Sequence, residues 1–103
     1  MKDILDKLDK ILEERKFSNS NDSYIAALYK KGNSHICNKV IEEASELVEA
    51  TKESENRIIH ESADLLFHVL VLLASHDIKY VRILEELENR FGTSGIEEKN
   101  NRK

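Results

Sequence analysis

The scarcity of residues that break helices is the feature that most limits what this chain can fold into. Its 103 residues contain no proline, and its three glycines, Gly32, Gly92 and Gly95, stand where helical hydrophobic patterns stop. Proline and glycine are the residues that most disfavour a helix interior. We therefore predict an all-α fold, a bundle of four or five helices separated by short breaks.

Apolar residues recur at helical spacing in five segments of the sequence. The predicted helices cover about 4–15, 24–31, 33–53, 56–75 and 79–91. Ser23 or Asp22 could cap the second helix through a side-chain oxygen. In the fifth helix, four apolar residues at helical spacing are expected to face the core: Val81, Leu84, Leu87 and Phe91.

The fourth predicted helix is apolar on almost every side from Leu65 onward. A helix that is hydrophobic all round must be enclosed by neighbours, and a chain this short buries a modest share of its surface. We therefore expect homodimerisation to complete the core. Residues 1–103 are expected to form one domain, with 96–103 as a flexible tail.

Charge and cysteine content exclude several classes of protein. Sixteen basic and twenty acidic residues give a net charge of -4, which argues against binding nucleic acid through a broad basic surface. One cysteine cannot form an intrachain disulfide, and the charged start "MKDILDKLDK" is unlike a signal peptide. The most apolar stretch, "LLFHVLVLLA", has about half the roughly 20 residues of a membrane span. We expect a soluble, cytoplasmic protein that binds neither nucleic acid nor membrane.

The third predicted helix gathers four acids beside its apolar side. At about 100° per residue, Lys39, Glu43 and Glu46 share the flank of that side, whereas Glu42 and Glu49 point further toward water. Taken alone, such a run of charge is usually a solvated face.

The fourth predicted helix changes this interpretation. Glu61, Asp64 and His68 share one face of a helix expected to be enclosed, and ionised acids are rarely buried without a partner. Two helices joined by a brief turn pack antiparallel, which brings Glu43 and Glu46 opposite Glu61 and Asp64. Two like charges about 4 Å apart repel by roughly 4 kcal/mol at an effective dielectric near 20.

The repulsion between these carboxylates can be relieved in three ways. Protons can be taken up, nearby basic residues can pair with the acids, or a divalent cation can sit among the oxygens. The candidate basic partners are Lys39 and Arg57. A carboxylate site with histidine only at its edge suits a hard ion such as Mg²⁺, with Mn²⁺ as a possible substitute. Because Mg²⁺ usually completes its shell with phosphate oxygens, the pattern points to phosphate chemistry. Glu42 could bind a second ion or accept the proton of an attacking water.

Several motifs resemble one known superfamily. "EEASE" at 42–46 and "ESAD" at 61–64 resemble the acidic helices of the MazG-like, all-α nucleotide pyrophosphohydrolases. "SYIAALYKKG" at 23–32 and "RFGTSGIEEK" at 90–99 make the chain most similar to the phosphoribosyl-ATP pyrophosphatase family within it. The resemblance implies an ATP-derived substrate: Mg²⁺-dependent hydrolysis of 1-(5-phosphoribosyl)-ATP to 1-(5-phosphoribosyl)-AMP and pyrophosphate, in histidine biosynthesis. It also implies a homodimer or a dimer of dimers.

The resemblance also implies roles for individual residues. The metal ligands it implies are Glu43, Glu46, Glu61 and Asp64, with Glu42 assisting Glu43 and Glu46 in catalysis. The substrate-binding residues it implies are Lys31, Lys39, His68, Ser94 and Lys99. The chain departs from the family pattern at Ile41, where a small residue is expected before the glutamate pair.

Three other functions compete with this one. A broader pyrophosphohydrolase would keep the chemistry and act on cellular or damaged nucleoside triphosphates. A di-iron or di-manganese redox bundle would need Glu-x-x-His pairs, whereas His68 lies four residues after Asp64 and seven after Glu61, and the chain has no Glu-x-x-His pair. A helical dimerisation module without catalysis would leave the carboxylates of the enclosed helix unexplained.

Overall fold

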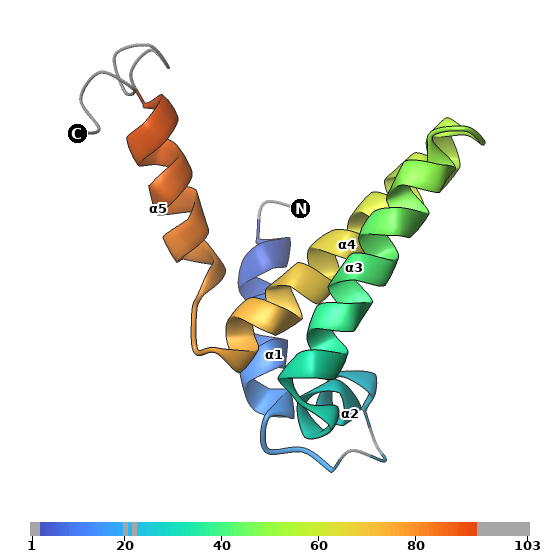
Figure 1. Ribbon diagram of the computed structural model, residues 1–103. Coiled ribbons are helices and arrows are strands. Elements are labelled where there is room, and N and C mark those ends of the chain that lie inside the picture. The colour runs from blue at the N-terminus through green and yellow to red at the C-terminus, as the bar shows by residue number, and fades with distance from the viewer. Residues whose placement is uncertain (1–2, 20, 22, 93–103) are drawn as a thin grey trace.

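The described part of the chain contains helices joined by short turns and no strands, as predicted. The computed structural model describes residues 3–19, 21 and 23–92 (Figure 1). The helices are α1 (Ile4–Arg15), α2 (Tyr24–Lys31), α3 (Asn33–Ala50), α4 (Glu55–Ser75) and α5 (Tyr80–Phe91). Our expectations for Asp22, Ser94, Gly95, Lys99 and the tail 96–103 lie outside the described residues.

Local chemistry explains where the helices begin and end. The Ser23 and Ser54 hydroxyls accept hydrogen bonds from backbone N–H groups in the first turns of α2 and α4, each at 3.2 Å. Gly32 joins α2 directly to α3 with φ of 94°, a left-handed conformation that side-chain-bearing residues rarely adopt. The third helix ends at Ala50, three residues earlier than predicted. Residues 51–53 instead form a turn in which each N–H donates to the carbonyl three residues before it.

Helices α3 and α4 form a long antiparallel hairpin joined by residues 51–54 (Figure 1). Helix α1 packs on the C-terminal half of α4, and α2 covers the end of the hairpin remote from its turn. The buried core lies at that end and consists of Leu12, Leu28, Ile36, Leu70, Val71 and Ala74. The hairpin is therefore anchored by the core at one end, and the other helices do not cover one side of its middle.

Helix α5 departs from the sequence-based expectation. Figure 1 shows it projecting away from the other four helices, and none of its residues is buried. Val81, Leu84 and Leu87 are 42 to 47% exposed, and Phe91 is 66% exposed. The prediction that these four face the core is wrong for the single chain, because the other helices already enclose that core. Helix α4 is likewise not enclosed within one chain, since Leu66 remains half exposed.

Helix α4 is the one described helix that is long and apolar enough to cross a membrane, with a mean hydropathy of 1.5 over 18 residues. It also carries the Glu61 and Asp64 carboxylates and packs along α3. These features are typical of the central helix of a bundle.

Candidate active site

The α3 half of the site is a row of charges along one side of the helix. Lys39 Nζ lies 3.5 Å from Glu42 Oε1 and 3.7 Å from Glu43 Oε1. The Glu43 side chain is 12% exposed, against 57% for Glu42. Glu43 therefore lies against the rest of the protein and Glu42 faces solvent, as their helical phases predicted.

The α4 half places a buried acid beside a second acid and a histidine. Glu61 is buried and forms an ion pair with Arg57, whose Nη1 lies 3.0 Å from Glu61 Oε1. His60 Nε2 lies 3.3 Å from Asp64 Oδ2. His60, Glu61 and Asp64 each offer a ligand atom, and these atoms all lie within 4.8 Å of one another. His60 was not among the predicted site residues, although its position four residues before Asp64 on one helix could have revealed it.

The two halves of the site influence each other across the hairpin. Partial burial raises the pKa of Glu43 above its ordinary value, and the negative charges of Asp64 and Glu61 raise this pKa further. The positive charge of Lys39 opposes these effects. Carboxylates of α3 and α4 thus share one electrostatic environment.

Glu46 lies one helical turn beyond Glu43 and is exposed. Its side chain makes no hydrogen bond or ion pair with the described residues. The structure therefore places Glu43 within electrostatic reach of Asp64 and Glu61, whereas neither Glu43 nor Glu46 belongs to the group of close ligand atoms that His60, Glu61 and Asp64 form.

The donor set fits a hard divalent cation. The four carboxylates expected as ligands, at Glu43, Glu46, Glu61 and Asp64, have two basic partners, Lys39 and Arg57. Because these partners also pair with Glu42 and Glu53, at least two negative charges remain. Carboxylate oxygens suit Mg²⁺ and Mn²⁺, and the single imidazole of His60 adds a nitrogen that Mn²⁺ accepts more readily. Both of the expected basic partners are in fact used, so ion pairing offsets part of the charge and not all of it.

His68 contacts the backbone of Asp64, one of the acids. It is buried, and its Nδ1 is 2.8 Å from the Asp64 backbone carbonyl oxygen. Because a carbonyl only accepts, Nδ1 carries a hydrogen, and in the neutral ring Nε2 accepts from the Tyr24 hydroxyl at 2.9 Å. Both nitrogens are therefore occupied, and His68 is a hydrogen-bonded core residue beside the site.

The other expected substrate-binding residues differ in setting. Burial alone would lower the pKa of Lys39, but the Tyr24 hydroxyl and the Glu42 and Glu43 carboxylates outweigh burial and raise it. Lys39 is thus a firmly charged group beside the acids. Lys31 is exposed at the end of α2, and its side chain has no partner among the described residues.

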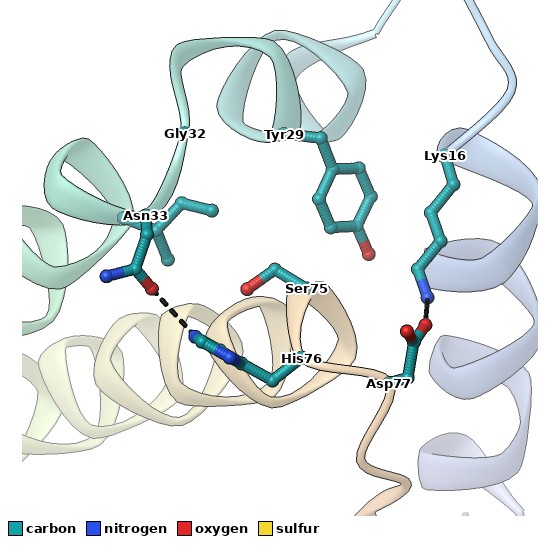
Figure 2. Close-up of a pocket in the computed structure, with 8 residues that line it drawn as sticks. Lys16, Tyr29, Gly32, Asn33, Ser75, His76 and Asp77 are labelled. Carbon is teal, nitrogen blue, oxygen red and sulfur yellow. Dashed lines mark hydrogen bonds and ion pairs between the residues drawn. The ribbon is translucent and has the colours of Figure 1, made fainter.

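A separate pocket of about 330 Å³ lies at the end of the hairpin remote from its turn, where α1, α2, α3 and α4 meet (Figure 2). It is lined by Lys16, Tyr29, Gly32, Asn33, Ile36, Ser75, His76 and Asp77. Figure 2 shows Lys16 Nζ paired with Asp77 Oδ1 at 2.7 Å, and His76 Nε2 bonded to Asn33 Oδ1 at 2.7 Å.

The remaining polar side chains of this pocket are also engaged. The Tyr29 hydroxyl donates to the Leu12 carbonyl at 2.9 Å, and the Ser75 hydroxyl donates to the Leu72 carbonyl at 2.7 Å. Every polar side chain in the lining is thus bound to another part of the protein. We interpret the pocket as a junction that ties the helices together, and the carboxylate-bearing middle of the hairpin as the chemically active region.

The fold and the acids define a class of all-α proteins with a cluster of carboxylates on neighbouring helices, a kind of site that suits divalent cations. Comparison with known proteins narrows this class. Residues 5–91 match the family model described as "Phosphoribosyl-ATP pyrophosphohydrolase". The chain belongs to this family.

Relatives match it over almost its whole length. It is 50% identical to the phosphoribosyl-ATP pyrophosphatase of Vesicomyosocius okutanii, over 99% of this chain and 98% of the relative. It is 49% identical to the protein of the same name in Ruthia magnifica, over 96% of this chain and 95% of the relative. In Helicobacter hepaticus, the histidine biosynthesis bifunctional protein HisIE is 50% identical over 97% of this chain, which matches 44% of that longer protein.

Proposed function

We propose that this chain hydrolyses 1-(5-phosphoribosyl)-ATP to 1-(5-phosphoribosyl)-AMP and pyrophosphate, as a step of histidine biosynthesis in the cytoplasm. The observation that carries the proposal is the cluster of carboxylates on the α3–α4 hairpin, formed by Glu43, Glu61 and Asp64. The chain that carries this cluster aligns over almost its whole length with proteins named phosphoribosyl-ATP pyrophosphatase. The whole of residues 1–103 is proposed to act as one domain.

The proposed cofactor is Mg²⁺, held by Glu43, Glu46, Glu61 and Asp64. When bound, Mg²⁺ would neutralise phosphate oxygens and lower the pKa of a water that attacks phosphorus. Convergence of Glu61, Asp64 and His60 within 4.8 Å supports this assignment. The exposed Glu46 is expected to swing inward on binding.

The chain's own residues have separate tasks in this proposal. Arg57 fixes Glu61 through the 3.0 Å ion pair, so that one carboxylate keeps its place whether or not a cation is bound. Lys39 holds Glu43 and carries a positive charge toward the polyphosphate, assisted by Lys31, Ser94 and Lys99. Glu42 and Glu43 are the candidates for accepting the proton of the attacking water, since Glu43 has a raised pKa and Glu42 adjoins it.

We further propose that two copies of the chain associate. The apolar side of α5 is exposed at Val81, Leu84 and Leu87 and adjoins an apolar groove of about 190 Å³ that reaches Leu66 and Leu70 on α4. Contiguous apolar surface of this kind is typical of an interface between subunits. Sedimentation should show a dimer or tetramer, and Leu84→Glu should shift the protein toward monomer.

One assay tests the catalytic proposal. Wild type should release pyrophosphate from phosphoribosyl-ATP with Mg²⁺ and stop when EDTA is added, and Glu46→Gln should lose this activity while staying folded. The matched control is Glu49→Gln, because Glu49 lies on the same helix and, within the part of the chain that the structure describes, forms an ion pair with Lys52 alone, at 3.7 Å. Release of pyrophosphate from deoxynucleoside triphosphates, with none from phosphoribosyl-ATP, would instead support the broader pyrophosphohydrolase.

A further inference from the structure

Tyr24 is an exposed aromatic residue at the edge of the cluster of carboxylates on α3 and α4. It is the first residue of α2, and although it packs on α4 it remains 54% exposed. Aromatic side chains of this size usually bury most of their surface. A tyrosine that is fixed beside a proposed phosphate site and exposed on one side is suited to binding part of the substrate.

Two contacts fix the orientation of this ring. Its hydroxyl donates to His68 Nε2 at 2.9 Å, and the His68 ring is anchored in turn to the backbone carbonyl of Asp64 at 2.8 Å. The ring also stacks on Phe67 with a centroid distance of 6.3 Å and an interplanar angle of 23°. One side of the ring is therefore covered, the hydroxyl is tethered, and the remaining surface faces outward.

The position of the ring relative to the acids is also defined. Asp64, whose carbonyl accepts from His68, is the residue whose side chain joins the group of possible metal ligands. Lys39, which pairs with Glu43, lies within electrostatic reach of the Tyr24 hydroxyl. One imidazole ring thus separates Tyr24 from the backbone that carries a carboxylate ligand.

We propose that the purine ring of the nucleotide stacks on the open side of Tyr24, and that His68 positions Tyr24 for this contact. The inference rests on the proposed function, in which the phosphates of the nucleotide bind at the carboxylates. The base of the same nucleotide must then lie beside the carboxylates, where Tyr24 offers an exposed ring. A base stacks on an aromatic side chain whatever its substituents, because the contact uses the π face. On this view His68 is a positioning residue that serves the nucleotide through Tyr24.

The main experiment compares ligands with and without a base. In Tyr24→Leu, the KM for phosphoribosyl-ATP and the inhibition constant of AMP should each rise about tenfold, the loss of roughly one stacking contact. The kcat should stay within about twofold, and the inhibition constant of inorganic pyrophosphate should not change. Phe17→Leu is the matched control, because Phe17 is 90% exposed, and it should alter none of these values.

Two results would overturn the inference. An AMP inhibition constant that stays at the wild-type value would show that the base does not contact Tyr24. An equal rise for AMP and pyrophosphate would show that the substitution disturbs the phosphate site. If wild type hydrolyses no phosphoribosyl-ATP, the proposed function fails, whereas direct titration with AMP still tests Tyr24.

Tyr24→Phe separates the ring from its tether. It keeps the stacking surface and loses the hydrogen bond to His68, so its KM should rise by less than that of Tyr24→Leu. Adding His68→Leu to Tyr24→Phe should raise KM no further if His68 acts through the hydroxyl. A Tyr24→Phe variant as impaired as Tyr24→Leu would assign binding to the hydroxyl and contradict the stacking model.

Fluorescence gives an independent measure that does not need a folded Tyr24→Leu variant. The chain has three tyrosines and no tryptophan, so its emission reports on tyrosine. AMP should quench part of the wild-type emission, and this quenching should be absent in Tyr24→Phe although AMP still binds. Quenching that persists in Tyr24→Phe would contradict the inference.

Discussion

Removing one negative charge from the cluster of carboxylates on α3 and α4 should make the cation-free protein more stable. We predict this for Asp64→Asn, because Asp64 and Glu61 offer oxygens within 4.8 Å of each other. At that separation and an effective dielectric near 20, two negative charges repel by about 3.5 kcal/mol. The Asp64 side chain is 42% exposed, so solvent should screen this to about 1.5 kcal/mol.

A smaller loss partly offsets the gain. His60 lies 3.3 Å from Asp64 in an exposed pair, and such pairs contribute about 0.5 kcal/mol or less. The net expectation is a gain of about 1 kcal/mol, which raises the melting temperature by roughly 4 to 8 °C in a chain of this size.

Thermal unfolding followed by far-UV circular dichroism measures both effects. In EDTA, Asp64→Asn should melt above wild type. With Mg²⁺ present at about ten times its dissociation constant, wild type should gain about 1.4 kcal/mol and the variant much less, since a ligand bound only by the native state stabilises it. All samples need one protein concentration, because association also shifts the melting temperature.

Glu49→Gln is again the control, since it removes a carboxylate of α3 outside the group. It should change neither the melting temperature in EDTA nor the response to Mg²⁺. The reasoning would be refuted if Asp64→Asn melted below wild type in EDTA, or if Mg²⁺ stabilised it as much as wild type.

Three further predictions test other parts of the structure. Leu28→Ala, at a side chain that is 1% exposed, should cost about 2 to 5 kcal/mol in urea unfolding; a loss under about 1 kcal/mol would contradict the packing. The hydrogen bond from Lys16 lowers the pKa of Asp77 in the folded protein. The Lys16–Asp77 pair therefore stabilises the fold at pH values above the pKa that Asp77 has in the unfolded chain, and this stabilisation is lost as pH falls through the lower pKa of the folded state. Asp77→Asn, which tolerates the φ of 59°, should flatten stability across that range, and an unchanged pH profile would count against the pair. His60→Gln should weaken binding of Mn²⁺ more than of Mg²⁺ because Mn²⁺ accepts nitrogen ligands more readily, as competition titrations would show; equal losses would remove His60 from the ligands.

Much of the fold follows from local sequence signals. Ser23 and the glycine at 32 mark the ends of α2, and the absence of proline allows the long helices of the hairpin. Helical phase alone also separated Glu43, which lies against α4, from the solvent-facing Glu42. These features were predictable because each depends on residues within a turn or two of one another.

What could not be predicted depends on contacts distant in sequence. The apolar residues of α5 have the pattern of a core helix, yet the surface they fit is not offered by the rest of the same chain. His60 is a different case, because its pairing with Asp64 lies within about one turn of α4 and the spacing of four residues could have revealed it. The hydrogen bond between Tyr24 and His68 could not be predicted, because these residues are 44 positions apart in the sequence.

The four-residue turn at 51–54 has a consequence for how the chain can vary. Because both rows of carboxylates stand on helices that follow one another directly, their alignment is encoded in one unbroken stretch of sequence. Deleting a single residue there would rotate α4 by about 100° and scatter the acids, whereas the segment between α1 and α2 could accept extra residues without moving them. The same contiguity suits the unit to fusion with a neighbouring enzyme, and the Helicobacter hepaticus relative carries the matching stretch within a longer bifunctional protein.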